Sequence, residues 1–151
     1  MAMNDFFTSG YGIRFNCTEA SDTTPQKIRE LLDLAPCLKA EVTEYLNECC
    51  ETNLEDATIE DFEDFEQDFS YGIPYLLSEA INEKYGPDFV CCLKDYDGFT
   101  FVLMPKGMPW EFEQFEKPLT EEKLKSFFEE FYNVLYEKNI DFGEVTVHDF
   151  G

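Results

Sequence analysis

A tight turn between two runs of alternating apolar residues constrains the fold of this chain more than any other feature. The turn is Asp97-Gly98, in the middle of residues 89–104. Aspartate followed by glycine favours a two-residue type I′ turn, because both central residues of that turn need a positive φ. The turn sets the register of its strands and predicts three cross-strand pairs: Tyr96 with Phe99, Lys94 with Phe101, and Cys92 with Leu103. Residues 89–104 are therefore expected to form an antiparallel hairpin.

Two helices are expected between a first strand at residues 12–18 and residue 50. Thr23 and Gln26 stand in the relation of a capping box at the start of the first helix. Pro36 ends or kinks that helix, because proline lacks the N–H that the helical ladder needs. A second helix is expected to follow as far as about Cys50, since its apolar residues recur at helical spacing.

Two more helices are expected between Thr58 and the hairpin. Thr58 is the predicted cap of a third helix, whose expected inward side consists of three phenylalanines: Phe62, Phe65 and Phe69. Gly72 interrupts this helix, and Pro74 can begin a fourth. Gly86-Pro87 then forms a strong stop, because glycine suits the left-handed position after a helix and proline cannot continue it.

The clearest helical pattern comes last. Thr120 is the predicted N-cap, and apolar residues follow it on one face: Leu124, Phe127, Phe128, Phe131 and Leu135. A final strand is expected over residues 144–150, with Val145 and Val147 pointing inward.

The expected order of elements is β-α-α-α-α-β-β-α-β. Helices that are segregated from an antiparallel hairpin predict the α+β class, with about five helices on one face of a small antiparallel sheet of about four strands. No internal repeat or low-complexity linker divides the sequence. Residues 1–151 are therefore expected to form a single domain.

Size and composition favour a folded, cytoplasmic protein. Hydrophobic residues make up 44% of the 151 residues, and 16 Phe with 8 Tyr supply much apolar area for a core. No apolar run approaches the roughly 20 residues that cross a membrane. Residues 1–7 lack the basic segment of a signal peptide, so a cytoplasmic address is expected, with reduced cysteines.

The formal charge of −22 is the outlier of the composition. It repels nucleic acid and anionic membranes and attracts basic protein surfaces, so neither nucleic acid nor membrane is an expected partner. The charge is uneven, because residues 51–100 hold 14 acidic and two basic residues. Within them, residues 51–68 contain nine acids and no base. The expected partner is therefore a basic protein, with the oligomeric state left open.

The acidic run coincides with the predicted third helix. Five of its acids spread over the side away from the phenylalanines and are the predicted partner-binding carboxylates: Glu60, Asp61, Glu63, Asp64 and Asp68. At a rise of about 1.5 Å per residue, one acid at every second residue gives roughly one charge per 3 Å. One strand of DNA presents a phosphate about every 3.4 Å. A helix of this kind can imitate a nucleic-acid backbone, although a solvated, merely solubilising surface explains the same run.

An aromatic and acidic segment supplies the predicted anchors of the same interface. Its members are Trp110, Glu111, Phe112, Glu113 and Phe115. Large aromatic side chains carry much of the binding energy at the centres of protein interfaces.

Catalysis has little support in the sequence, and no cofactor or metal is predicted. The cysteines occur as adjacent pairs instead of the spaced pairs that bind zinc. A thiol- or metal-dependent enzyme remains the alternative from another class, with Cys91, Cys92 or Cys49 acting beside the single histidine, His148. No nucleophile elbow, P-loop or dinucleotide-binding motif is present. The chain is therefore expected not to be an enzyme.

In size and charge the chain resembles the small acidic inhibitors of phages and mobile elements that imitate nucleic acid, such as anti-CRISPR or anti-restriction proteins. The resemblance covers bulk properties of the whole chain and no motif, so it implies a class of function and no site residues. The leading hypothesis is an inhibitor of a basic nucleic-acid-binding protein. The alternative is an immunity or antitoxin-type protein that neutralises one basic nuclease, because both functions use the same electrostatics.

Overall fold

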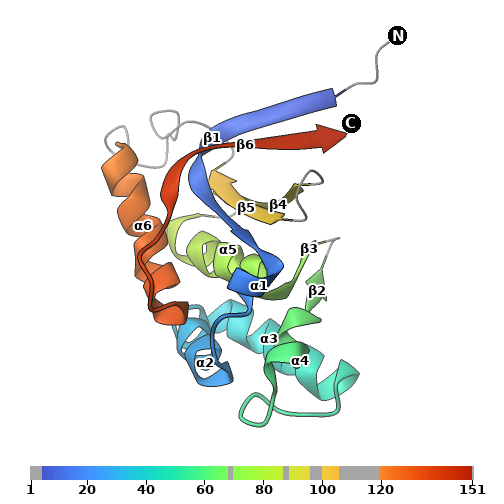
Figure 1. Cartoon of the computed structure of the whole chain (residues 1–151). Coiled ribbons are helices and arrows are strands. Elements are labelled where there is room, and N and C mark those ends of the chain that lie inside the picture. Colours follow the sequence, from blue (N-terminus) through green and yellow to red (C-terminus); the bar gives the residue numbers. More distant parts are fainter. Residues whose placement is uncertain (1–4, 68–69, 87–88, 96–99, 106–119, 151) are drawn as a thin grey trace.

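The chain is described by a computed structural model, which covers residues 5–67, 70–86, 89–95, 100–105 and 120–150 (Figure 1). For residues 5–9, 15–18, 66–67, 70–71, 93–95, 100–102, 104–105 and 146–150 the description is of the backbone.

A four-stranded antiparallel sheet has the order β4-β5-β1-β6. Its strands are β1 (Asp5–Asn16), β4 (Val90–Asp95), β5 (Thr100–Pro105) and β6 (Phe142–Phe150). The hairpin of β4 and β5 has the predicted register, since Cys92 pairs with Leu103 and Lys94 pairs with Phe101. The third predicted pair lies outside the described residues. The local turn rule therefore fixed the pairing of this hairpin correctly.

Helices gather on one side of this sheet, with α5 next to it and α2, α3 and α4 farther away (Figure 1). Their bounds are α1 (Cys17–Ala20), α2 (Pro25–Asp33), α3 (Pro36–Cys49), α4 (Ile59–Glu63), α5 (Gly72–Tyr85) and α6 (Glu121–Leu135). Mixed helix with an antiparallel sheet is the predicted α+β class, which is confirmed.

The core lies between the helices and the sheet. It forms one cluster of buried residues, among which Phe62, Phe89, Phe128 and Phe131 are the largest that are fully enclosed. The predicted apolar face of α6 is buried throughout. Thr120 caps this helix as expected, because its Oγ1 accepts a hydrogen bond from Lys123 N at 3.1 Å.

The predicted cap of α2 is wrong by one residue. The hydroxyl of Thr24, not that of Thr23, accepts the hydrogen bond from Lys27 N, at 3.2 Å. Thr23 instead donates to the carbonyl oxygen of Leu135 at 2.7 Å. A tertiary contact at the end of α6 thus takes the side chain that the local pattern assigned to the cap.

The predicted third helix is much shorter than expected, because α4 ends at Glu63. Phe65 turns into the core, where its ring lies 5.2 Å from that of Tyr45 and 6.0 Å from that of Tyr75. A helix through residue 69 would have carried the acidic run with no base to relieve its repulsion. Aromatic packing and charge therefore both favour the early end.

A small hairpin replaces the missing part of that helix. It consists of β2 (Glu66–Gln67) and β3 (Ser70–Tyr71), and Gly72 N donates to the carbonyl oxygen of Phe65 at 2.9 Å across its base. Gly72 has a φ of +82°, which its lack of a side chain permits. The helix α5 begins at Gly72, so the predicted start at Pro74 is two residues late.

The predicted order of elements is corrected in two places. It lacks the single turn α1, which takes Cys17 and residue 18 from the predicted first strand, and it lacks the pair β2 and β3. The predicted face of the last strand is also wrong. Phe142 pairs with the buried Ile13 and packs against the core, so Val145, three residues on, falls on the opposite face of the sheet. The side chain of residue 147 lies outside the described part.

Candidate functional site

The four described acids of the predicted binding helix do not form one outward face. Glu60 and Asp64 are exposed. Asp61 completes a capping box with Thr58, accepting a hydrogen bond from Thr58 N at 2.9 Å. Glu63 accepts a hydrogen bond from the Ser21 hydroxyl at 2.5 Å. Two of these carboxylates therefore stabilise the fold, and two remain available to solvent.

The other predicted binding residues lie outside the described residues. They are Asp68, Trp110, Glu111, Phe112, Glu113 and Phe115. Their part in an interface stays a prediction.

A second row of acids, which the sequence reading missed, runs along α3. Glu41, Glu44 and Glu48 are all exposed. At 100° per residue they fall within about 60° of one another around the helix axis, and they span about 10 Å along it. Their spacing of i, i+3 and i+7 is visible in the sequence. These three acids precede the dense run at residues 51–68, on which the prediction was based. We call these three residues, with Glu51 that follows, the α3 acidic flank.

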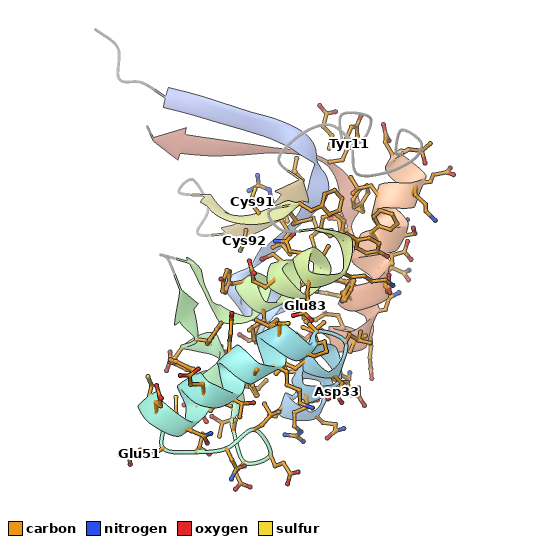
Figure 2. The ribbon with its side chains drawn as sticks, turned by 180° about the vertical axis from the view of Figure 1, so that it is seen from behind. Tyr11, Asp33, Glu51, Glu83, Cys91 and Cys92 are labelled. Carbon is orange, nitrogen blue, oxygen red and sulfur yellow. The ribbon has the colours of Figure 1, made fainter. Side chains whose placement is uncertain are left out.

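Glu51 takes an unusual backbone conformation at the end of the flank. Its φ is +53°, in the left-handed region that helix ends usually fill with glycine or asparagine. Thr52 N donates to the carbonyl oxygen of Leu46 at 3.0 Å, which closes the helix around this residue. The side chain of Glu51 points away from the body at the end of α3 (Figure 2). A charged residue thus occupies a position where a residue without a side chain is less strained.

The local electrostatics of the flank are unfavourable for stability. Like charges at i, i+3 and i, i+4 repel, and acids near the C-terminus of a helix face the negative end of its dipole. Within the described part of the chain no cation pairs with any of the four glutamates. The lysine of α3, Lys39, lies on the other flank and pairs with Asp33 at 2.6 Å. The acids are therefore placed where they cost stability.

Tyr45 connects the flank to the end of α4. Its hydroxyl donates to the carbonyl oxygen of Asp64 at 2.8 Å, and burial together with the neighbouring Cys50 raises the pKa of Tyr45 to about 12. The exposed Asp64 is thereby held next to α3. Asp64, one of the predicted binding acids, thus lies beside the α3 acidic flank, which was not predicted.

The cysteines are free thiols wherever their side chains are described. Cys91 and Cys92 are half-buried neighbours on β4, and burial raises the pKa of Cys92 to about 12. A thiol with that pKa stays protonated near neutral pH and is a poor nucleophile. Cys49 is exposed at the end of α3, two residues before Glu51, which lies far from Cys91 and Cys92 in Figure 2.

His148 lies on β6, at the opposite edge of the sheet order from β4, and its side chain is outside the described part. Among the described residues, no group of three or more histidine, cysteine or acidic side chains could hold a metal ion. No described helix is long and apolar enough to cross a membrane.

Two surface clefts border α2, and both are lined mainly by polar side chains. The first has a volume of about 340 Å³, and its Lys27 is paired with Glu137 at 3.1 Å. The second has a volume of about 470 Å³ and includes the pair of Lys39 and Asp33. Each cleft thus contains one ion pair among its charged side chains.

Comparisons of the chain with protein-family models, with curated proteins and with solved structures found no match.

Proposed function

We propose that this chain is a non-enzymatic acidic binding protein, which inhibits a positively charged nucleic-acid-binding protein by presenting carboxylates in place of phosphates. The observation that carries the proposal is the α3 acidic flank. Its four exposed glutamates lack cationic partners in the described chain, and one of them takes a left-handed φ of +53°. Side chains that oppose stability are retained more readily when another property, such as binding, depends on them.

The geometry of the flank supports docking on a phosphate-binding surface. Successive carboxylates on α3 are offset by about 4.5–6 Å along the helix axis. The phosphates of one DNA strand are offset by about 3.4 Å along its axis. The carboxylates of the flank therefore form a row with the same sign of charge as the phosphates but a wider spacing. Asp64 adds a charge beside this row.

The net charge of −22 adds a long-range field to this local row. Such a field accelerates association with a basic surface and makes the rate sensitive to salt. Glu60 extends the acidic surface, whereas Asp61 and Glu63 contribute mainly to folding through their hydrogen bonds. Trp110, Phe112 and Phe115 remain the proposed aromatic anchors.

The first experiment identifies the partner. The protein is immobilised and exposed to extract of a plausible host at low salt, and retained proteins are eluted with high salt. We expect a basic nucleic-acid-binding protein that salt releases, because screening weakens contacts between exposed charges. Retention of neutral proteins alone, or of basic proteins that salt does not release, would overturn the proposal.

The second experiment maps the surface. The triple variant E41K/E44K/E48K should slow association with the retained protein by about tenfold or more and reduce its salt dependence. The matched control E30K/E122K/D141K makes the same change of net charge at exposed acids elsewhere. This control variant should keep most of the association rate of the unchanged protein. Equal losses in both variants would show that the flank has no special part.

The identity of the retained protein also separates the two acidic-binder hypotheses. A single basic nuclease would favour the immunity-type function over a general nucleic-acid decoy. The electrostatic requirement is the same for both.

A further inference from the structure

The strand β6 presents an open edge in the described structure. It is the last strand of the sheet, and no described strand pairs with its outer side. It pairs with β1 through nine successive positions without a bulge, from Asp5 with Phe150 to Ile13 with Phe142. The strand β5 pairs with β1 from Ile13 onward, so the outer part of β1 and β6 forms a two-stranded ribbon. Figure 1 shows this ribbon reaching away from the helices.

An open edge of this length is a template for pairing with another strand. Three common protections are absent, since residues 142–150 contain no proline and no lysine and pair with β1 without a bulge. The ribbon is also only weakly acidic for so acidic a chain. Its two strands together carry two net negative charges of the −22. Electrostatic repulsion therefore opposes association at this edge less than it does at the acidic run of residues 51–68.

The sequence of β6 is complementary to itself in reverse. Directly opposite residues of an antiparallel pair point to the same face of the sheet. When a strand pairs with a copy of itself, the twofold axis therefore lies between the two copies of one residue. The central residue of β6 is Thr146. An axis there gives five kinds of pair between copies: Phe142 with Phe150, Gly143 with Asp149, Glu144 with His148, Val145 with Val147, and Thr146 with itself.

Every one of these pairs is favourable or neutral. Apolar residues oppose apolar residues, threonine opposes threonine, and each acid opposes histidine or glycine. No acid opposes an acid, although the chain as a whole has 33 acids to 11 basic residues. Such cross-strand pairs stabilise antiparallel sheets, whereas like charges directly opposite destabilise them.

We propose that two copies of this chain associate through their β6 edges, antiparallel about Thr146, to form one continuous eight-stranded sheet. The occupant of the edge is a second copy, because the register matches this strand to itself over its whole length. The interface is isologous, as twofold symmetry requires. It also leaves the α3 acidic flank of each copy free, since α3 lies on the far side of the helical layer from the ribbon (Figure 1).

Sedimentation velocity of the full chain tests the proposal over a range of concentrations up to about 100 µM, near physiological salt, where the Debye length is about 8 Å. We expect a reversible monomer–dimer equilibrium. H148E places an acid across from Glu144 at two symmetric positions and should weaken the dimer about tenfold. E144K/H148E restores opposite charges at both positions and should recover the affinity. The control T8E adds the same charge on β1, away from the dimer edge, and should change little.

Hydrogen exchange gives a readout that needs no variant. The amides on the outer edge of β6 should gain protection as the protein concentration rises, while those of α3 should not. A wild-type protein that stays monomeric at every concentration would overturn the proposal and leave the edge to an extended segment of another protein. A dimer that H148E does not weaken, or that the double variant does not restore, would also overturn it, because another surface would then form the dimer. The test requires no binding partner, so its result is independent of the proposed inhibitory function.

Discussion

Polar side chains have specific partners in one region of this molecule and lack them in another. At the C-terminal end of α5, each polar side chain that the packing encloses meets a specific partner. On the α3 acidic flank, four carboxylates meet none in the described chain. The polar side chains of the first region join α5 to β4 and α6, whereas the carboxylates of the second make no such connection in the described chain.

The enclosed region is centred on two connections. Asn82, 7% exposed, donates to the carbonyl oxygen of Val90 at 2.9 Å and accepts from Val90 N at 2.7 Å. Glu130 of α6 forms an ion pair with Lys84 and accepts a hydrogen bond from the Tyr85 hydroxyl at 2.5 Å. The Tyr85 ring also stacks on Phe127, with centroids 4.0 Å apart. These contacts hold the helices against the sheet.

The contrast shows that acidity in this chain has two different roles. Some carboxylates, such as Glu130 and Asp61, are parts of the folded structure. The glutamates of the flank stabilise nothing in the described chain, so their removal should leave the fold intact or improve it. Variants in the two regions should therefore change the free energy of unfolding in opposite directions.

The largest loss of stability is expected for Asn82→Ala. The variant leaves the N–H and carbonyl of Val90 buried without partners, so unfolding should become easier by about 3 kcal/mol. Urea denaturation followed by circular dichroism measures the change. The matched control is Asn47→Ala on the exposed side of α3. Its free energy should stay within about 0.5 kcal/mol, and similar losses in both variants would remove the contrast between the regions.

A smaller loss, about 1 kcal/mol, is expected for Glu130→Gln, because its carboxylate is partly exposed and solvent screens it. Burial raises the pKa of Glu130, but the hydrogen bonds from Lys84 and Tyr85 outweigh it and hold the pKa below its usual value. The stabilisation is therefore complete above the unfolded pKa of about 4.3 and disappears as the pH falls through the lower folded value. Unfolding measured from pH 7 to pH 3 should show the two proteins converging, and a constant difference would contradict this.

A gain in stability is expected for Glu51→Gly. Glycine adopts the φ of +53° without strain, so stability should rise by about 0.5–1 kcal/mol. Glu55→Gly removes the same charge from an exposed turn residue that lacks a positive φ. Thermal unfolding should separate the two variants. A gain of equal size in both would assign the effect to charge and not to backbone strain.

The smallest effect is a gain of a few tenths of a kcal/mol for Glu44→Gln, because it removes repulsion from Glu41 and Glu48. The gain should fade in about 1 M salt, where the Debye length is about 3 Å. Glu30→Gln on α2 is the control, since Lys27 and Asp33 balance each other around it. A loss of stability for Glu44→Gln would reveal a partner for this carboxylate.

Local rules predicted those parts of the fold that local geometry decides. The Asp97-Gly98 turn gave the register of β4 with β5, and Thr120 gave the start of α6, because a turn type and a cap depend on a few adjacent residues. The end of α4 and the role of Thr23 were missed. Both depend on residues distant in sequence, namely Tyr45 and Tyr75 around Phe65, and Leu135 for Thr23.

The candidate site was predicted in kind but not in place. Net charge identified an acidic surface, and the density of acids pointed to α4. The structure shows that Asp61 and Glu63 have hydrogen-bonding partners, one of them the distant Ser21, which density alone cannot reveal. The three acids of α3 could be recognised in the sequence by their spacing of i, i+3 and i+7. Spacing on a helix would have been a better guide than the count of acids.

The position of β1 has a consequence for how the protein folds during synthesis. This strand is made first, yet it lies in the middle of the sheet, between β5 and β6. Its partners leave the ribosome about 85 and 130 residues later, which at 5–20 residues per second leaves it unpaired for several seconds or longer. Contacts of such long range slow folding, because the loop must close before pairing stabilises it. We therefore expect a nascent chain halted before β6 to expose β1 to chaperones, and the complete sheet to form only once β6 is released.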